Sequence, residues 1–526
     1  MKPFSRRQFL GSATRRALGL AGLGLAGSRT SAAARPQQGR RPNILFAIAD
    51  DWGWPHASIA GAKGVRTPNF DRVAKEGVLF TNTFCAAPQC SPNRAAILTG
   101  RHIWQLEEAG THSSLFPNKF KVYPDMLEGV GYHVGFTGKG WGPGNWRDGG
   151  WSRNPAGAEY SERKFDSVQW SGISPIDYAG NFDAFLAKRP EGAPFCFWYG
   201  GHEPHRKYER GSGLKSGKKL EDAPVPAFLP DDTTVRSDML DYVLEVEWFD
   251  TQLGRMLQEL EALGELENTL VVVTGDNGMP FPRAKANLYE YGVRVPLAIR
   301  WGERVKPGRT ADDLISFVDL APTFLDVAGV MPPAEMAGKS LVASLTSGAS
   351  GPNEYVLFGR ERHSHARYDN LGYPARAIRT RDHLYVRNYK PDRWPAGDPE
   401  GYYDIDDGPT KTFLLENKDK YPDLFELAVG KRPEEELYAV KGSMDCMKNL
   451  AGDSEHRETR EKLSAKLAAV LSEQKDPRAL GTGDVFDGYP RFGAMRPELG
   501  GCARQGVYNP HYQEPRLPSK EQGQES

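Results

Sequence analysis

The sequence predicts an α/β fold, a large sheet layered by helices, with a smaller α+β domain after it. Short apolar runs typical of buried strands alternate with helical patterns up to about residue 330. A segment rich in Gly and Ser at 347–352 interrupts this pattern, and shorter strand-like runs follow it. The chain has 526 residues, which is more than one small domain needs and favours two domains.

Two predicted strands end in pairs of polar residues. The nearly continuous apolar run at 43–49 leads into Asp50 and Asp51, and the run at 269–274 leads into Asp276 and Asn277. Because ligands of open α/β sheets bind beyond the carboxyl ends of the strands, both pairs are candidate site residues. The other expected elements are strands at 78–84, 132–137, 195–199 and 295–301 and helices at 67–75, 239–263 and 318–327.

The break at 347–352 divides the remaining chain. The smaller domain is expected to hold short strands and one helix, and the last residues are polar and rich in Pro and Gly, which is typical of an extended tail. The expected divisions are a larger domain at 41–350, a smaller domain at 353–480 with strands at 355–358, 375–379 and 384–388 and a helix at 458–471, and a tail at 481–526.

The first 34 residues resemble a secretory signal peptide. Arg6 and Arg7 precede a Gly-rich apolar stretch at 17–27, and alanines at 32–34 form a small-residue cleavage site. Paired arginines before Phe9 resemble a twin-arginine signal, which the export machinery recognises and which is not an anchor. The apolar stretch is too short and too rich in Gly to span a bilayer. We therefore expect a periplasmic or secreted protein with no stable membrane anchor.

Charge and cysteine content exclude several classes of protein. The net charge is −1, so no general positive field favours nucleic acid as a partner. The five cysteines are scattered and odd in number, and they form neither a disulfide framework nor a zinc ribbon. An anionic ligand would therefore be bound by a few placed residues.

The most specific motif is Cys-Ser-Pro-Asn-Arg-Ala-Ala-Ile-Leu-Thr-Gly-Arg at 90–101. It places Cys90 at the start of a short helix, with Pro92 in the first turn and Arg94 positioned for an anion. No neighbouring His/Asn pair supports a thiol protease. The string is similar to the Cys-x-Pro-x-Arg signature of type I sulfatases and its Leu-Thr-Gly-Arg extension. In that family a maturase oxidises the cysteine to formylglycine (3-oxoalanine), whose hydrate is the nucleophile.

The resemblance also implies a fold and a metal site. Type I sulfatases belong to the alkaline phosphatase-like superfamily, which implies an α/β/α sandwich with a mixed, mostly parallel sheet. It also implies a smaller C-terminal α+β domain, with a short antiparallel sheet, that contributes to the substrate pocket. Asp50, Asp51, Asp276 and Asn277 match the family's metal ligands beside Cys90. Carboxylate and amide oxygens suit Ca²⁺ or Mg²⁺, and family members usually carry Ca²⁺.

Three further residues match catalytic positions of the family. Lys139 lies in Gly-Lys-Gly-Trp, His205 follows Pro204, and Lys285 precedes the Tyr-Glu-x-Gly-x-Arg-x-Pro run at 289–296. The metal and Arg94 are expected to hold the hydrate ionised, while Lys139 and Lys285 neutralise charge on the sulfuryl oxygens. Either His205 or Lys285 is expected to protonate the leaving atom.

One position departs from the family pattern. Trp141 stands where many sulfatases have a histidine that helps to regenerate the aldehyde, so the identity of that base is open between His102 and His205. Trp141 and Trp146 are candidates for stacking on a sugar ring, and core packing is the alternative for both.

Several segments resemble those of N-sulfoglucosamine sulfohydrolases. They are His-Glu-Pro-His-Arg at 202–206, Asp-Asn-Gly-Met-Pro-Phe-Pro at 276–282, and a His-rich stretch from Glu361 to Arg379. These enzymes usually have Arg where this chain has Lys285. The resemblance implies a glycosaminoglycan or other sulfated polysaccharide as substrate, with N- or O-sulfated glucosamine of heparan type as the first expectation. The expected substrate contacts are His102, Trp141, His202, Arg206, His363, His365 and Arg376.

Two other functions remain as alternatives. A phosphodiesterase or phosphatase of the same superfamily would use Ser or Thr as nucleophile, often with two metals, which Cys90 followed by Pro92 and Arg94 opposes. A non-catalytic protein that binds sulfated glycans would have lost Cys90 or a metal ligand, and neither is lost. The sequence therefore favours an exported sulfatase, with a sulfated saccharide, the maturase and the twin-arginine machinery as partners.

Overall fold

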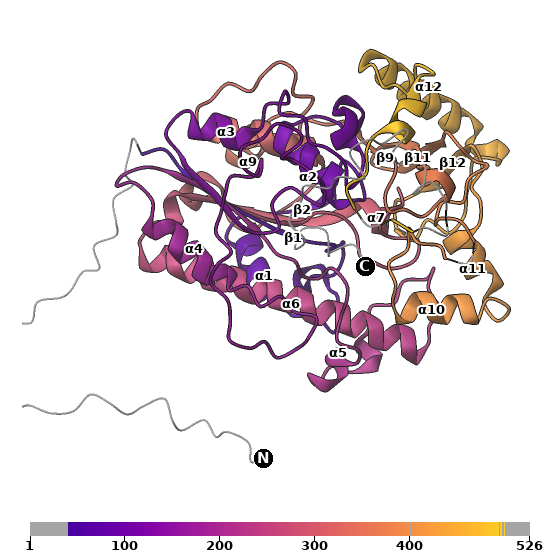
Figure 1. The fold of residues 1–526 in the computed structure, drawn as a ribbon, viewed down its shortest axis with the longest axis horizontal. Helices are drawn as coiled ribbons and strands as arrows, with labels where there is room; N and C mark the ends of the chain where they lie inside the picture. The colour runs from indigo at the N-terminus through magenta and orange to yellow at the C-terminus, as the bar shows by residue number, and fades with distance from the viewer. Residues whose placement is uncertain (1–39, 400, 494, 497–498, 500–526) are drawn as a thin grey trace, which may run out of the picture. The chain divides into compact units, whose positions relative to one another are not determined.

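The computed structural model describes residues 40–399, 401–493, 495–496 and 499. Its larger sheet has the strand order β4-β3-β5-β1-β6-β7-β2-β8 (Figure 1). Within this sheet β7 alone runs antiparallel to its neighbours, which confirms the expected mixed, mostly parallel sheet. The strands are β1 Asn43–Ala49, β2 Val78–Phe84, β3 His133–Gly138, β4 Ala158–Glu159, β5 Phe195–Gly200, β6 Thr269–Gly275, β7 Arg294–Arg300 and β8 Arg309–Ser316.

Helices cover both faces of this sheet, as Figure 1 shows. Along β1, Ile44 and Phe46 belong to one buried cluster and Leu45 and Ala47 to another, because alternate side chains of a strand point to opposite faces. A strand buried on both faces explains the continuous apolar run in the sequence. The first cluster contains α2 Cys90–Thr99, α3 Tyr123–Glu128 and α8 Leu320–Val327, and the second contains α1 Pro68–Lys75, α4 Tyr178–Ala187 and α6 Thr233–Ala262.

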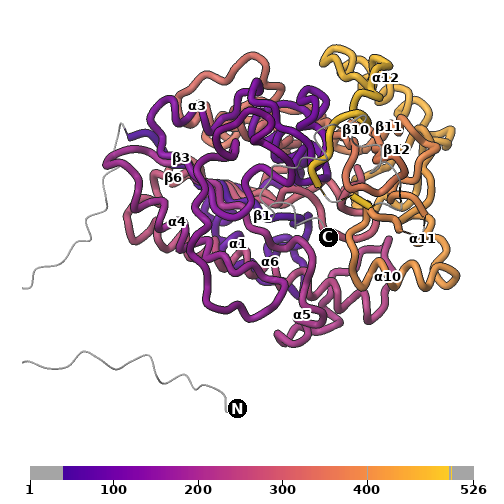
Figure 2. The backbone as a smooth tube through the Cα atoms, viewed as in Figure 1, coloured from indigo at the N-terminus to yellow at the C-terminus, as the bar shows by residue number. Residues whose placement is uncertain are grey.

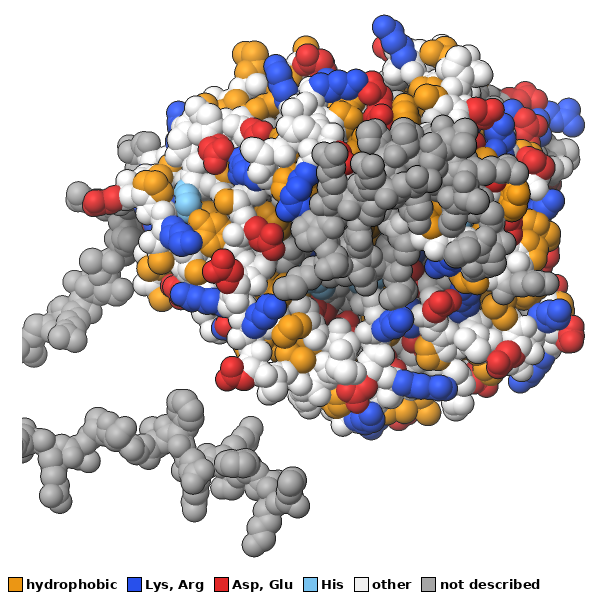
Figure 3. Space-filling model, viewed as in Figure 1, with side chains coloured by type: hydrophobic (Ala, Val, Ile, Leu, Met, Phe, Trp, Pro, Cys, Tyr) orange, Lys and Arg blue, Asp and Glu red, His pale blue; other side chains and the backbone are white. Residues whose placement is uncertain are grey.

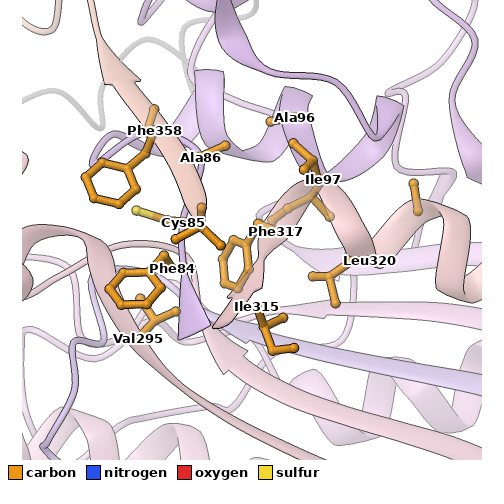
Figure 4. Packing of buried hydrophobic residues seen from close by; sticks show 14 of the residues in the cluster. Phe84, Cys85, Ala86, Ala96, Ile97, Val295, Ile315, Phe317, Leu320 and Phe358 are labelled. Carbon is orange, nitrogen blue, oxygen red and sulfur yellow. The ribbon is translucent and has the colours of Figure 1, made fainter. Parts of the chain in front are cut away.

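The smaller sheet is antiparallel throughout, as the family resemblance implied. Its order is β12-β11-β10-β9. The ring of Phe358 stacks on Phe84 of the larger sheet with centroids 5.9 Å apart, and Gly359 N donates to Ala86 O at 3.0 Å (Figure 4). The two sheets therefore share one hydrophobic cluster. The strands are β9 Val356–Arg360, β10 Ala375–Arg379, β11 His383–Asn388 and β12 Glu435–Ala439, and α12 Arg457–Glu473 packs on β10 and β11.

Several elements differ from the expected ones. The strands β4, β8 and β12 are not foreseen from the apolar pattern, since β4 has two residues and β8 is half exposed. The long helix α6 begins at Thr233, earlier than its apolar stripe, because the Asp232 side chain accepts a hydrogen bond from Thr234 N at 2.8 Å and caps it. The remaining helices are α5 Ser212–Lys215, α7 Glu290–Val293, α9 Val342–Ser347, α10 Pro409–Glu416 and α11 Pro422–Val429.

The register of the parallel strands brings their carboxyl ends to one edge. Ala49 of β1 is opposite Gly275 of β6, and Gly200 of β5 is opposite Gly138 of β3. The segments that follow these strands therefore meet at this edge, as does the start of α2 after β2. The helix α10, from the C-terminal part of the chain, lies beside α6 (Figure 2).

Two other expectations concern the ends of the chain and its surface. The expected signal peptide at 1–34 lies outside the described residues. Among the described helices, none combines the length and the apolar composition that a membrane span requires. Lys, Arg, Asp and Glu are interspersed over the face drawn in Figure 3, in keeping with the net charge of −1.

Candidate active site

Four polar residues at the ends of β1 and β6 are buried together; we call Asp50, Asp51, Asp276 and Asn277 the strand-end cluster. Asp51 N donates to Asp276 Oδ1 at 2.9 Å, and Asn277 Nδ2 donates to Asp51 Oδ1 at 2.7 Å. One oxygen from each of the three carboxylates lies within 4.8 Å of the others. Asp51 has a φ of 71°, a left-handed conformation that is costly for a residue with a side chain and concentrates at functional sites.

The strand-end cluster fits a divalent cation. Asn277 Oδ1 is buried and accepts no hydrogen bond from any described residue. Such an oxygen is costly to bury without a partner, and a cation would satisfy it. Three carboxylates and an amide oxygen are ligands that hard cations prefer, which identifies a candidate metal site.

Cys90 is the first residue of α2 and is buried against this cluster. Its Sγ donates to Asp50 Oδ1 at 3.2 Å. Burial raises the pKa of the thiol well above its ordinary value, and the charge of Asp50 raises it further. An unmodified thiolate is therefore disfavoured here, which argues against a thiol nucleophile.

Arg94 lies one turn further along α2 and is fully buried. Its Nε donates to Asp276 Oδ2 at 2.9 Å, and its Nη1 donates to Lys139 O at 2.6 Å. Nη2 makes no hydrogen bond within the described part of the chain and lies 3.9 Å from Asp50 Oδ1. The guanidinium therefore orients Asp276. Its Nη2 also lies near Asp50 Oδ1, the oxygen that accepts from Cys90.

Two buried lysines contact the carboxylates, one from the end of β3 and the other from the segment between β6 and α7. Lys139, directly after β3, places Nζ 2.5 Å from Asp50 Oδ2. Lys285 places Nζ 2.8 Å from Asp51 Oδ2 and 3.1 Å from His205 Nε2. The structure therefore brings together all five predicted catalytic residues and the strand-end cluster.

Burial and the neighbouring charges shift the pKa values of these acids in opposite directions. Burial opposes ionisation of Asp50, but Lys139 and the other nearby cations hold its pKa well below the ordinary value. Burial raises the pKa of Asp51 to about 6 and that of Asp276 to about 7, with neighbouring carboxylates adding to both. The crowded carboxylates are thus only partly compensated by the protein's own cations. Burial, followed by the charge of Lys285, lowers the pKa of His205, so this imidazole is neutral at pH 7.

Sequence reasoning missed Asp406, which approaches the site from the C-terminal part of the chain. Its Oδ2 lies 3.1 Å from Lys285 Nζ, so Lys285 is held between two carboxylates. Asp406 lies in Tyr-Asp-Ile-Asp-Asp, a stretch with no motif spacing, and only the tertiary structure identifies it.

These residues surround a cavity of about 50 Å³, which we call the central cavity. Its lining comes from segments on both sides of the break at 347–352. Its lining is Cys90, His112, Lys139, Pro143, His205, Lys285, His363, Ser364, Tyr403, Ile405, Asp406, Asp407 and Arg496.

Of the residues expected to contact substrate, His363 lines the central cavity. His202 lines a larger neighbouring cavity. Arg206 forms a bidentate pair with Asp238, with both N–O distances 2.8 Å, and this pair ties the segment after β5 to α6. His365 is buried, and its Nδ1 accepts from Arg496 N at 2.7 Å.

Three other expected contacts are held in the interior. His102 stacks on Trp104 with centroids 4.5 Å apart, and burial lowers its pKa to about 3. Arg376 is fully buried and paired with Asp476 and Glu361. Trp141 donates from Nε1 to Ser91 O at 3.0 Å, which fixes its ring beside α2. The structure brings neither His102 nor Arg376 to the central cavity, because each is used in packing or ion pairing elsewhere.

Comparisons with known proteins find sulfatases and sulfohydrolases. The family model "Sulfatase" matches residues 42–330, and the model "N-sulphoglucosamine sulphohydrolase, C-terminal" matches residues 283–421. An ulvan-active sulfatase of Formosa agariphila is 26% identical over 84% of this chain and 77% of its own length. Human N-sulphoglucosamine sulphohydrolase is 28% identical over 68% of this chain and 74% of its own length.

Solved structures share the fold. A structure described as a complex with its substrate D-glucosamine-2-N,6-O-disulfate superposes with a TM-score of 0.62 and 22% sequence identity. The match covers 83% of this chain and 99% of that one.

Proposed function

This chain belongs to the sulfatase family, and from that premise we propose that it hydrolyses sulfate esters or sulfamates of a sulfated polysaccharide. The observation that carries the proposal is the convergence at one cavity of Cys90, two lysines and His205 beside a buried acidic cluster. These are the groups needed to hold a sulfuryl group and to move a proton to its leaving atom.

We infer that Cys90 is converted to formylglycine. The support is the Cys-x-Pro-x-Arg string and the raised pKa of the thiol, which makes the unmodified side chain a poor nucleophile. The formylglycine hydrate would supply a nucleophilic oxygen, and Ca²⁺ held by the strand-end cluster would supply positive charge beside it. Mg²⁺ fits less well, because it demands stricter octahedral geometry.

The protein's own cations stabilise charge at the reacting group. Lys139 and Lys285 both line the central cavity. Lys139 is paired with Asp50, and Lys285 with Asp51. Each ammonium is already oriented and desolvated, so it loses little freedom when charge develops on sulfuryl oxygens. Arg94 lies behind them and fixes Asp276.

The contacts of His205 support separate proton-transfer roles for His205 and Lys285. His205 Nδ1 is 2.7 Å from Arg206 O, a carbonyl that only accepts, so Nδ1 carries the proton. His205 Nε2 therefore presents a lone pair to Lys285 Nζ, 3.1 Å away. Lys285 holds the proton that the leaving oxygen or nitrogen needs, directly or through His205. His205 Nε2 is also the candidate base where the family histidine is replaced by Trp141.

Substrate identity is proposed from the relatives. The C-terminal model of N-sulphoglucosamine sulphohydrolase spans residues that line the central cavity, including His363 and Asp406. N- or O-sulfated glucosamine of heparan type is therefore the first candidate. The ulvan-active relatives make a sulfated algal polysaccharide the second.

The N-terminal residues support export. Residues 1–34 resemble a twin-arginine signal, and that route carries folded proteins, so we propose that a cytosolic maturase modifies Cys90 before export to the periplasm or medium. Immunoblots of cell fractions from wild type and from an Arg6→Lys, Arg7→Lys variant test this. We expect the variant to stay in the cytosol, and unchanged export would contradict the proposal.

Release of inorganic sulfate tests the activity. Protein with formylglycine at position 90, verified by peptide mass, is offered N-, 2-O-, 3-O- and 6-O-sulfated saccharides and one phosphodiester, with Cys90→Ala as the matched control. We expect the wild type alone to release sulfate from one class of linkage. Hydrolysis of the phosphodiester alone would favour the phosphodiesterase, and equal glycan binding by both proteins with no release would favour a binding protein.

A further inference from the structure

The central cavity has a deeply buried end and a less buried end. Cys90, Lys139 and Lys285 line it and are buried. Tyr403 and Arg496 line it as well and are only half-buried. Its volume of about 50 Å³ can take a sulfuryl group but is too small for a sugar ring. A saccharide whose sulfate lies beside Cys90 would therefore leave its ring at the end formed by Tyr403 and Arg496.

Arg496 differs from the other charged residues of this lining in having no ion-pair partner in the described part of the chain. Each of the other Lys and Asp residues of the lining is paired with a group of opposite charge. The pairs are Lys139 with Asp50, Lys285 with Asp406, and Asp407 with Lys411. The positive charge of Arg496 is therefore available to a ligand in the cavity.

The guanidinium of Arg496 is held in place before any ligand binds. Its Nη1 donates to His365 O at 3.0 Å, and its plane lies over the ring of Tyr403, 4.1 Å from the centroid. Tyr403 is itself held, because its carbonyl accepts from Ser364 Oγ at 2.5 Å. Nε and Nη2 of Arg496 donate to no described residue. A guanidinium that is already oriented loses little freedom when these remaining donors bind a ligand.

The chemistry of a guanidinium indicates which ligand group Arg496 would bind. Its planar N–H groups bind a carboxylate or a sulfate through paired, charge-assisted hydrogen bonds. The scissile sulfate already has Lys139 and Lys285 at the buried end of the cavity, so a cation at the less buried end suits a second anion. Residue 496 also lies beyond residue 421, where the match to the family models ends.

We propose that Arg496 is a specificity-determining residue, which binds a second anionic group, a sulfate or a carboxylate, on the sugar unit that carries the scissile sulfate. This inference rests on the proposed function and extends it to the class of substrate. The preferred substrate is then a sugar with two anionic groups, one beside Cys90 and the other at Arg496.

Three sulfated saccharides test the proposal. They share one sulfated position and differ in one further substituent of the same ring, which is a hydroxyl, a second sulfate or a carboxylate. We expect the wild type to prefer an anionic saccharide to the hydroxyl one in kcat/KM, and the preferred anion identifies the group. Arg496→Gln should lower this preference by about tenfold to a hundredfold, because charge-assisted hydrogen bonds are lost.

Arg496→Lys separates charge from geometry. It keeps the positive charge but loses the paired donors, so it should retain part of the preference. A wild type with no preference for either anion would overturn the proposal. An equal loss of activity on all three saccharides in Arg496→Gln would also overturn it, because Arg496 would then act on the scissile sulfate or on the fold.

Arg304→Gln is the matched control. The guanidinium of Arg304 also lies over an aromatic ring, that of Trp301, 4.8 Å from the centroid, and it forms no ion pair with any described residue. Arg304 is exposed and does not line the central cavity. The preference of this variant should equal that of the wild type. An equal change in Arg304→Gln and Arg496→Gln would contradict a specific role for Arg496.

Binding separates this inference from the proposed function. Calorimetry in the non-reacting Cys90→Ala background measures the Kd of each of the three saccharides without turnover. We expect the added Arg496→Gln change to weaken binding of the preferred anionic saccharide about tenfold more than that of the hydroxyl one. If the wild type released no sulfate from any substrate, the proposed function would fail, while the Kd values would still decide the role of Arg496. Equal Kd values for the three saccharides, or no binding, would overturn that role.

Discussion

Two groups of buried polar residues in this protein differ in how completely their charges and hydrogen-bonding groups are satisfied. In the network of Arg376, Arg478, Glu361 and Asp476, every guanidinium nitrogen and every carboxylate oxygen has a partner. In the strand-end cluster Asn277 Oδ1 has no donor within the described chain, and Asp51 and Asp276 have raised pKa values. Satisfied charges stabilise a fold, whereas incompletely compensated ones indicate a site that awaits a ligand.

The largest expected effect comes from breaking the satisfied network. Asp476→Ala leaves Arg376 buried without its bidentate partner, and we expect a loss of about 3–5 kcal/mol in the free energy of unfolding. Chemical denaturation measures it. Asp312→Ala is the control, since its pair with Arg381 is 73% and 55% exposed, and it should cost under about 1 kcal/mol. Equal losses in both variants would contradict the contrast.

The corresponding change in the strand-end cluster should act on activity instead. We expect Asp276→Asn to lower kcat/KM for sulfate release by about 10²–10³-fold, because it removes a proposed metal ligand and the partner of Arg94. In chelator, the free energy of unfolding should change much less than in Asp476→Ala, because the new amide oxygen can still accept from Arg94 and one crowded carboxylate is neutralised. Destabilisation as large as that of Asp476→Ala would show that the two clusters are alike.

Metal addition tests the same contrast directly. At about 100 times its Kd, Ca²⁺ should raise the free energy of unfolding by about 2.7 kcal/mol, by binding only the folded state. Thermal unfolding with Ca²⁺, Mg²⁺ or chelator measures this. Asn277→Leu removes the unpartnered Oδ1 and should reduce this Ca²⁺-dependent increase. Asp476→Ala is less stable with and without the ion, but Ca²⁺ should raise its free energy of unfolding by as much as in the wild type. A Ca²⁺ shift unaltered by Asn277→Leu would place the ion elsewhere.

The smallest expected effect concerns Asp406, which connects the C-terminal region to the site. Asp406→Asn removes one of the two carboxylates that hold Lys285, and we expect kcat to fall about 10- to 100-fold with little change in stability. Because Asp406 positions Lys285, Asp406→Glu should restore part of the activity. A rise in KM at constant kcat would instead assign Asp406 to substrate binding.

The sequence by itself determined the strand-end cluster and the Cys90 motif, because both depend on local patterns. A buried parallel strand is continuously apolar and ends in its functional residues, so Asp50 and Asp276 could be located from the runs before them. The short helix that starts at Cys90 and the apolar stripe of α6 likewise follow from local patterns, although α6 begins at Thr233, before that stripe.

Only the tertiary structure decided which charged residues meet. Arg376 and Asp406 both lie in stretches without distinctive spacing, yet Arg376 is paired in the interior and Asp406 reaches Lys285, 121 positions earlier in the chain. Trp141 is held by the carbonyl of Ser91, 50 positions earlier in the chain, a partner that the sequence does not place beside it. The physical reason is that the partners of a buried polar group are chosen by long-range packing, and a charge in the sequence does not reveal whether the fold will satisfy it internally or leave it for a ligand.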